Sequence, residues 1–153
     1  MVIEILQAYV SSICADHRHQ GRLVHNLRCA LENAPRLKWS KGSTAQIVYC
    51  LAMLRDHLAT HFAREEEGGY LEEALVHSPV FQSEANRLMD EHPQLLKRFD
   101  ALLEMAKAEA DEPARWPAIA KEVNEAVNQL LTHELDENKL LQGAFTADLY
   151  LDE

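Results

Sequence analysis

Residues 47–65 read IVYCLAMLRDHLATHFARE. Apolar side chains recur in this stretch at intervals of three and four residues, which is the period of one face of an α-helix. They are Ile47, Leu51, Leu54 and Leu58. The same face continues with His61 and Glu65, which are four residues apart. The pattern therefore predicts a helix that turns a histidine and a carboxylate toward the protein interior.

Helical periodicity also marks one stretch before residues 47–65 and two stretches after it. The first stretch runs from about residue 2 to residue 34, and Pro35 is expected to end it. The helix that follows should open at Ser43, where Gln46 completes a capping box. Four helices with short connections predict an all-α fold, an antiparallel up-down-up-down four-helix bundle.

The third helix is expected to begin at Ser78 and Pro79, because a serine N-cap followed by proline is a common helix start. Pro93 lies inside it and predicts a kink or a restart near Glu91. A turn at residues 111–113 should then lead into the fourth helix.

The composition is that of one ordinary globular domain, with 153 residues of which 47% are hydrophobic and 26% are charged. We expect the bundle to span residues 1–144 and residues 145–153 to form an acidic C-terminal tail. The net charge of −10 argues against nucleic acid and anionic membranes as partners. Three cysteines without a C-x-x-C pair fit a reducing compartment, and no apolar run is long enough to span a bilayer. A cytoplasmic location is therefore expected.

One histidine from each predicted helix should contribute to a single layer, because residues equidistant from an antiparallel connection lie side by side. These four are His17, His61, His92 and His133. The midpoint of the first and second histidines is residue 39, and the midpoint of the second and third lies between residues 76 and 77. The midpoint of the third and fourth lies between residues 112 and 113. All three midpoints fall at or beside predicted connections, so the four histidines are expected at one height.

Two carboxylates should point into the same layer. Glu137 follows His133 by four residues, as Glu65 follows His61, and the two helices concerned run parallel. Buried carboxylates need a cation or an arginine, and no arginine or lysine shares their helix faces at this level. Imidazole and carboxylate together suit iron, manganese or zinc. The alternative is a polar layer in a metal-free bundle.

Two other histidines compete for places in this site. His25 is an alternative to His17 on the first helix, but it lies on an arginine-rich face and at a level too far from His61. His57 lies one turn before His61 near the edge of the core face, and is a further candidate ligand.

At this point the sequence resembles the hemerythrin-like (HHE cation-binding) family, roughly over residues 17–141. The resemblance rests on the histidine of the first helix, HFAREE at residues 61–66, Glu91-His92, and HELDEN at residues 133–138. It implies a diiron centre in which two carboxylates bridge the metals.

On that resemblance, the bridging carboxylates are matched by Glu65 and Glu137. His17 and His61 would then serve one iron, and the remaining two histidines of the layer the other. Oxygen-carrying members have two histidines one turn apart on the third helix, whereas here Leu88 and Leu96 flank His92 at that spacing. His57 is a candidate replacement.

The sequence therefore predicts a non-haem metal protein, with two irons per chain, that binds or senses oxygen, nitric oxide, peroxide or iron. Zinc and manganese also suit the ligands. The partner would be a small diatomic molecule or peroxide, and the oligomeric state is left open. An iron-dependent oxidase, peroxidase or nitric oxide reductase is the enzyme alternative, although no catalytic residue, substrate pocket or electron-supplying domain is evident. A structural bundle with a vestigial site is the third reading.

Overall fold

The computed structural model describes residues 2–36, 38–67 and 79–151. Four long helices account for most of them: α1 (Val2–Arg36), α2 (Lys41–Glu67), α4 (Gln82–Ala108) and α5 (Trp116–Leu151). Two short 3₁₀ turns, η1 (Pro79–Phe81) and η2 (Pro113–Arg115), precede α4 and α5. No strand occurs in these ranges. None of the described helices has the length and apolar character that crossing a membrane requires.

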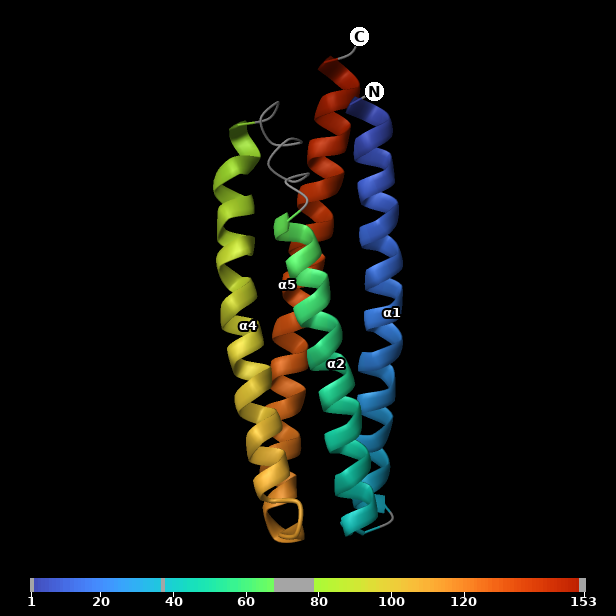
Figure 1. Cartoon of the computed structure of the whole chain (residues 1–153), viewed down its shortest axis with the longest axis vertical. Helices are drawn as coiled ribbons and strands as arrows, with labels where there is room; N and C mark the ends of the chain where they lie inside the picture. The colour runs from blue at the N-terminus through green and yellow to red at the C-terminus, as the bar shows by residue number, and fades with distance from the viewer. Residues whose placement is uncertain (1, 37, 68–78, 152–153) are drawn as a thin grey trace.

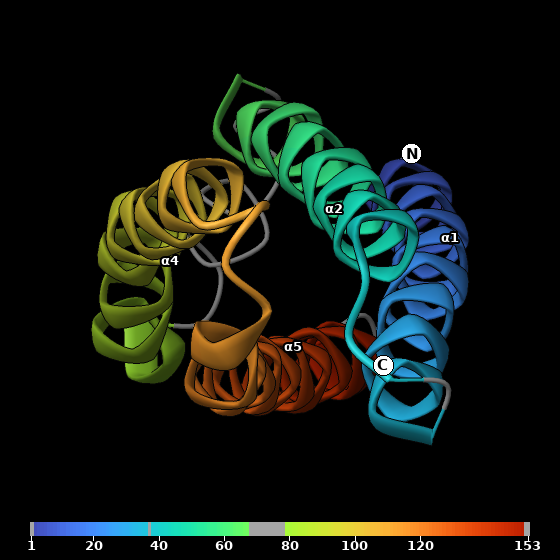
Figure 2. The ribbon, with the colours of Figure 1, turned by 90° about the horizontal axis from the view of Figure 1, so that it is seen from below.

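The helices form an antiparallel bundle whose two chain ends lie at the same end of the molecule (Figure 1). Seen along the bundle, α1 lies between α2 and α5, and α4 lies opposite α1 against the same two helices (Figure 2). This arrangement confirms the predicted up-down-up-down four-helix bundle.

Two predicted helix interruptions, at Pro35 and Pro93, are not observed. Helix α1 includes Pro35, because proline has a helical φ and the missing hydrogen bond falls in the last turn of the helix; inside a helix the fixed φ of proline likewise permits the chain to continue, at a cost. For the same reason α4 continues through Pro93 without a restart. Helix α5 continues to Leu151, and the division of the chain at residue 144 remains a prediction.

The cap of α2 is Ser40 instead of Ser43. The backbone N–H of Ser43 donates to Ser40 Oγ at 3.2 Å, and the N–H of Ser40 donates to Ser43 Oγ at 2.8 Å. This reciprocal pair satisfies two N–H groups at the helix start, so α2 begins at Lys41. Gln46, the expected partner in the cap, instead lies 3.8 Å from Cys50 Sγ.

An apolar core fills the bundle between the polar layer and the connections of α1 to α2 and of α4 to α5. Its fully buried side chains include Leu27, Leu51, Phe99 and Val123. Trp116 closes this end, because it stacks on Trp39 and its Nε1 donates to the carbonyl of Glu109 at 2.9 Å. A second apolar cluster lies beyond the layer, toward the chain ends: Ile13, Ala85, Leu88, Leu140, Leu141 and Ala144.

Candidate metal centre

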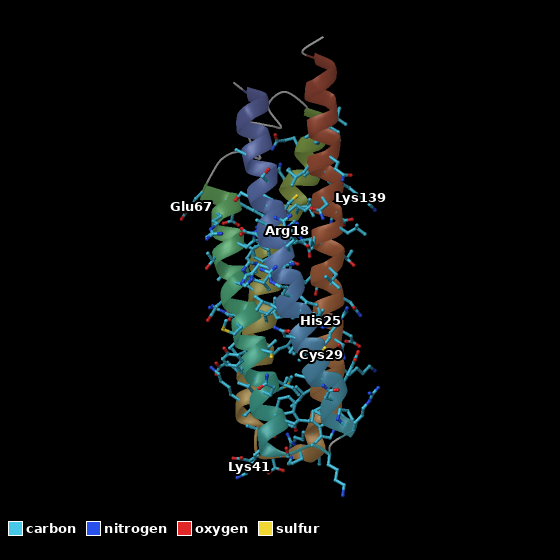
Figure 3. The ribbon with its side chains drawn as sticks, turned by 90° about the vertical axis from the view of Figure 1, so that its right-hand side faces the viewer. Arg18, His25, Cys29, Lys41, Glu67 and Lys139 are labelled. Atoms are coloured by element: carbon cyan, nitrogen blue, oxygen red, sulfur yellow. The ribbon has the colours of Figure 1, made fainter. Side chains whose placement is uncertain are left out.

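The layer between the two apolar clusters consists of ionisable side chains. All six predicted metal ligands are in it, and each is at most 9% exposed: His17, His61, Glu65, His92, His133 and Glu137. Arg18, Glu67 and Lys139, close in sequence to these residues, lie in the half of the bundle nearer the chain ends (Figure 3). The structure therefore brings one histidine from each helix to one height, as the turn midpoints predict.

Donor atoms of these side chains gather into two groups, each within 4.8 Å. The first group contains His17, His61, Glu65 and Glu137, and the second contains His92, His133 and Glu137. The imidazole rings in the first group are 5.1 Å apart and those in the second group are 5.0 Å apart. Each group thus pairs two histidines from neighbouring helices around a shared carboxylate.

The two glutamates connect the groups. Glu65 Oε1 contacts His61 Nε2 in the first group, and Glu65 Oε2 lies 3.3 Å from His92 Nε2 in the second. Glu137 Oε1 lies 3.7 Å from His17 Nε2, while Glu137 Oε2 lies 3.3 Å from His133 Nε2. Each carboxylate therefore directs one oxygen to each group, which is the arrangement that a bridging ligand of two cations requires.

The outer nitrogen of each of these imidazoles has an acceptor. His61 Nδ1 lies 2.9 Å from Asp16 Oδ2, and His133 Nδ1 lies 2.9 Å from Glu91 Oε2. An ionised carboxylate only accepts hydrogen bonds, so Nδ1 must carry the proton and donate it. Such outer partners fix the orientation and tautomer of metal-ligating histidines. The inner Nε2 atoms face the two carboxylates of the layer, where a cation could take the place of a proton.

The same holds for the other two histidines. His92 Nδ1 lies 3.3 Å from Glu66 Oε1, and His17 Nδ1 lies 3.1 Å from Asn138 Oδ1. In every case the acceptor belongs to a helix next to that of the histidine. The hydrogen bonds run from α1 to α5, from α5 to α4, from α4 to α2 and from α2 back to α1. They form a closed ring around the bundle.

Burial and mutual charge move the pKa values of the inner groups apart. Burial and the neighbouring His61 lower the pKa of His17 to about 4. Burial also acts to lower the pKa of His61, but its contacts with Glu65 and Asp16 outweigh this and raise it to about 9. Burial and the charge of Glu65 raise the pKa of Glu137 above its ordinary value. The layer without a cation therefore retains a proton, which metal binding has to displace.

A test of whether a metal fits is the number of buried polar atoms without a hydrogen-bond partner. Four atoms that face the middle of the layer have no partner in hydrogen-bond geometry, although other ligand atoms of the layer lie close to them: Glu65 Oε1, His92 Nε2, His133 Nε2 and Glu137 Oε1. Buried polar atoms are almost always hydrogen-bonded, because leaving one unpaired costs about 1–3 kcal/mol. Four orphaned atoms of metal-ligand type in one place fit a site for cations.

The structure separates the histidines that competed for the site. His25 is exposed on α1, nearer the Lys41 end of the bundle than Arg18 (Figure 3). His57 belongs to neither group of ligand atoms. Its ring lies parallel to that of His61 at 5.9 Å, on the side away from the layer that faces a pocket between α1 and α2. The structure therefore does not bring His57 to the second group as a replacement ligand.

Sequence reasoning missed most of the outer acceptors. Glu66 is 52% exposed and its Oε1 still lies 3.3 Å from His92 Nδ1. Glu134 accepts a 2.7 Å hydrogen bond from the buried Gln20 and lies 3.6 Å from His17 Nδ1. Both side chains reach across to a neighbouring helix. The one available signal is their position beside Glu65 and His133, where an outer partner is needed.

The second group has an apolar wall. Phe62, which is 2% exposed, stacks on His92 with ring centres 4.0 Å apart and planes 6° apart. The same ring meets His133 edge to face at 5.7 Å. Leu88, one turn from His92, is buried in the second apolar cluster. Among the residues that the structure describes, each group therefore contains two imidazoles.

The comparison with known families agrees with this geometry. The model of the hemerythrin HHE cation binding domain matches residues 10–145. The chain belongs to this hemerythrin family. Neither a curated protein nor a solved structure matches the chain in the corresponding comparisons. Membership of the hemerythrin family implies a non-haem metal, and the two groups of histidine and glutamate are the side chains that can hold it.

Proposed function

We propose that this hemerythrin-family protein holds two irons in the layer and binds or senses a small molecule there, namely oxygen, nitric oxide or peroxide, or responds to iron supply. The observation that carries the proposal is the bridging arrangement of the glutamates, in which both carboxylates offer one oxygen to each pair of histidines. Iron, when bound, would supply redox chemistry and coordination positions for a small ligand.

The residues around the site have distinct tasks in this proposal. The four Nε2 atoms and the two carboxylates would hold the metals, and the two negative charges would offset part of the positive charge of two irons. The outer acceptors hold each imidazole in the tautomer that presents Nε2 inward. Phe62 keeps water away from one side of the second group. With two imidazoles and shared carboxylates on each side, neither position is saturated, which favours binding of a small molecule.

The first experiment is metal analysis of the protein after anaerobic reconstitution with ferrous iron. We expect close to two irons per chain, because the layer has two groups of ligands. Glu65→Ala should lower bound iron below one equivalent, since one substitution removes a ligand from both groups. Glu67→Ala, an exposed position on the same helix, is the matched control. Two irons retained by Glu65→Ala would overturn the ligand assignment, and zinc or manganese in place of iron would overturn the choice of metal.

The enzyme alternative has a separate test. The unsaturated positions that allow binding also allow turnover, so an iron-dependent oxidase, peroxidase or nitric oxide reductase is the second candidate. A binding or sensing protein should show a change of its visible spectrum with nitric oxide or oxygen that reverses when the gas is removed. Repeated consumption of peroxide or nitric oxide by the iron-loaded protein would favour the enzyme.

We also propose a reducing, cytoplasmic setting. All three cysteines are free, and they are distributed between an exposed, a half-buried and a buried position: Cys14, Cys29 and Cys50. Exposed free thiols are characteristic of reducing compartments. Fractionation of cells that express the protein tests this proposal.

A further inference from the structure

A pocket of about 490 Å³ opens between α1 and α2, on the outer side of the metal layer. Its lining includes His19 and Asp16 from α1, and Met53, Asp56 and His57 from α2. His61 contributes to the pocket wall. The pocket therefore lies next to the layer and carries its own pair of imidazoles, although no group of three or more converging ligand side chains among the described residues includes His19 or His57.

The two histidines of this pocket repeat the geometry of the inner pairs. The rings of His19 and His57 are 4.9 Å apart with planes 74° apart. The inner pairs have ring separations of 5.1 Å and 5.0 Å, with planes 69° and 67° apart. Metal–nitrogen bonds of about 2.0–2.1 Å place two imidazoles on one tetrahedral ion with ring centres roughly 5 Å apart. The outer pair is therefore spaced as two histidines that share one ion.

A ring nitrogen of His57 without a hydrogen-bond partner also supports a metal ion in this pocket. Nε2 of His57 is buried and has no hydrogen-bond partner, which puts it in the same condition as Nε2 of His92 and of His133 in the layer. A buried ring nitrogen without a partner loses its hydration and gains nothing in return. A cation bound in the pocket would supply the missing partner.

Some charged side chains near the pocket favour binding of a cation there, and others oppose it. Asp16 and Asp56 favour a cation in the pocket. Arg64 opposes it, although its guanidinium is paired with Asp16 at 3.0 Å and 3.3 Å. Arg22 lies 3.3 Å from Nδ1 of His19, and a metal on Nε2 would move the ring proton to Nδ1 and displace this arginine. Because Arg22 is exposed, the loss of that hydrogen bond costs little.

The donor set indicates the kind of ion. Two imidazoles suit zinc and copper, whereas calcium and magnesium prefer oxygen. Met53 lies one turn before His57 in the same pocket and adds a thioether, which soft metals accept. We propose that His19 and His57 form a separate site at the α1–α2 pocket for an imidazole-preferring transition metal such as Zn²⁺ or Cu²⁺. This site does not depend on the inner layer holding iron.

The test counts bound Zn²⁺ by equilibrium dialysis of the iron-loaded full chain. Wild-type protein should bind one Zn²⁺ in addition to the iron, and His19→Gln and His57→Gln should each lose that ion. His19 is exposed, so its replacement leaves the packing intact. The matched control is His25→Gln, which changes another exposed histidine of α1 beside Cys29 and should keep the ion.

Cu²⁺ provides a second measurement, because electron paramagnetic resonance counts coordinated nitrogens. Two histidine nitrogens are expected in wild type, and the two-nitrogen signal should be lost in either pocket variant. Loss of the additional ion in His25→Gln alone, or no additional ion in wild type, would overturn the proposal. Glu65→Ala distinguishes the two sites, since it should lose inner iron and still bind the outer ion. An outer ion that disappears with Glu65 would belong to the layer.

Discussion

The apolar core and the ionisable layer lie next to each other in the same four helices, yet they differ in whether their buried side chains need further partners. In the core, Leu51 and Phe99 are fully buried among other hydrocarbon side chains and need no further partner. In the layer, Glu65 and His92 are equally buried, but both keep polar atoms without a hydrogen bond. The difference teaches that the core consists of side chains that need no partner, whereas the layer keeps unpaired ligand atoms to which a cation could bind.

The largest expected effect belongs to the core. Leu51→Ala should lower the free energy of unfolding by about 2–5 kcal/mol, because it removes buried methyl groups and leaves a cavity. Urea denaturation measures the change. Leu135→Ala is the control, since Leu135 is 54% exposed and should change stability by less than about 0.5 kcal/mol. Equal losses at the two positions would remove the distinction between core and surface on which the comparison depends.

Metal removal should lower the local stability of the helices around the layer and leave that of the core unchanged. Free metal at about 100 times its dissociation constant adds about 2.7 kcal/mol of stability, so chelation should lower the melting temperature. Hydrogen exchange should then speed up around His61 and His133, while amides around Leu51 and Val123 stay protected. A uniform increase along all four helices would show that core and layer unfold as one unit.

Removing an outer hydrogen-bond acceptor should weaken metal binding less than removing a metal ligand. Glu91→Gln replaces the carboxylate that holds His133 and should weaken metal binding by about 10–100-fold without abolishing it. A metal titration against a competing chelator measures the affinity. The neighbouring exposed Asp90→Asn is the control and should leave the affinity unchanged. If both substitutions act alike, the effect comes from net charge instead of the hydrogen bond.

The smallest effect is expected at the helix start farthest from the layer. Ser40→Ala removes the reciprocal cap of α2 and should cost about 1 kcal/mol in thermal or urea unfolding. Iron stoichiometry should not change, because the cap lies at the other end of the helix from Glu65. Ser12→Ala, at an exposed position within α1, should cost nothing.

The sequence contains enough information for the helices and for the inner side chains of the layer. Helical spacing fixes which face His61 and Glu65 occupy, and the positions of the connections fix their height. The outer acceptors could not be predicted in this way. Whether Glu66 reaches His92 depends on how far two neighbouring helices are rotated about their own axes, which a pattern within one helix does not record. The cap was missed for a local reason, since Ser40 and Ser43 both have the chemistry of an N-cap.

The closed ring of histidine-to-acceptor hydrogen bonds has a consequence for the alignment of the helices. Each helix contributes one histidine and one acceptor to it, so every helix is tied to both of its neighbours at the same height. Hydrocarbon contacts are not directional, so they specify the height of one helix against another less strictly than hydrogen bonds do. A shift of a single helix by one turn would break two of these directional bonds. The ring of four hydrogen bonds therefore favours one relative height and one rotation of the four helices.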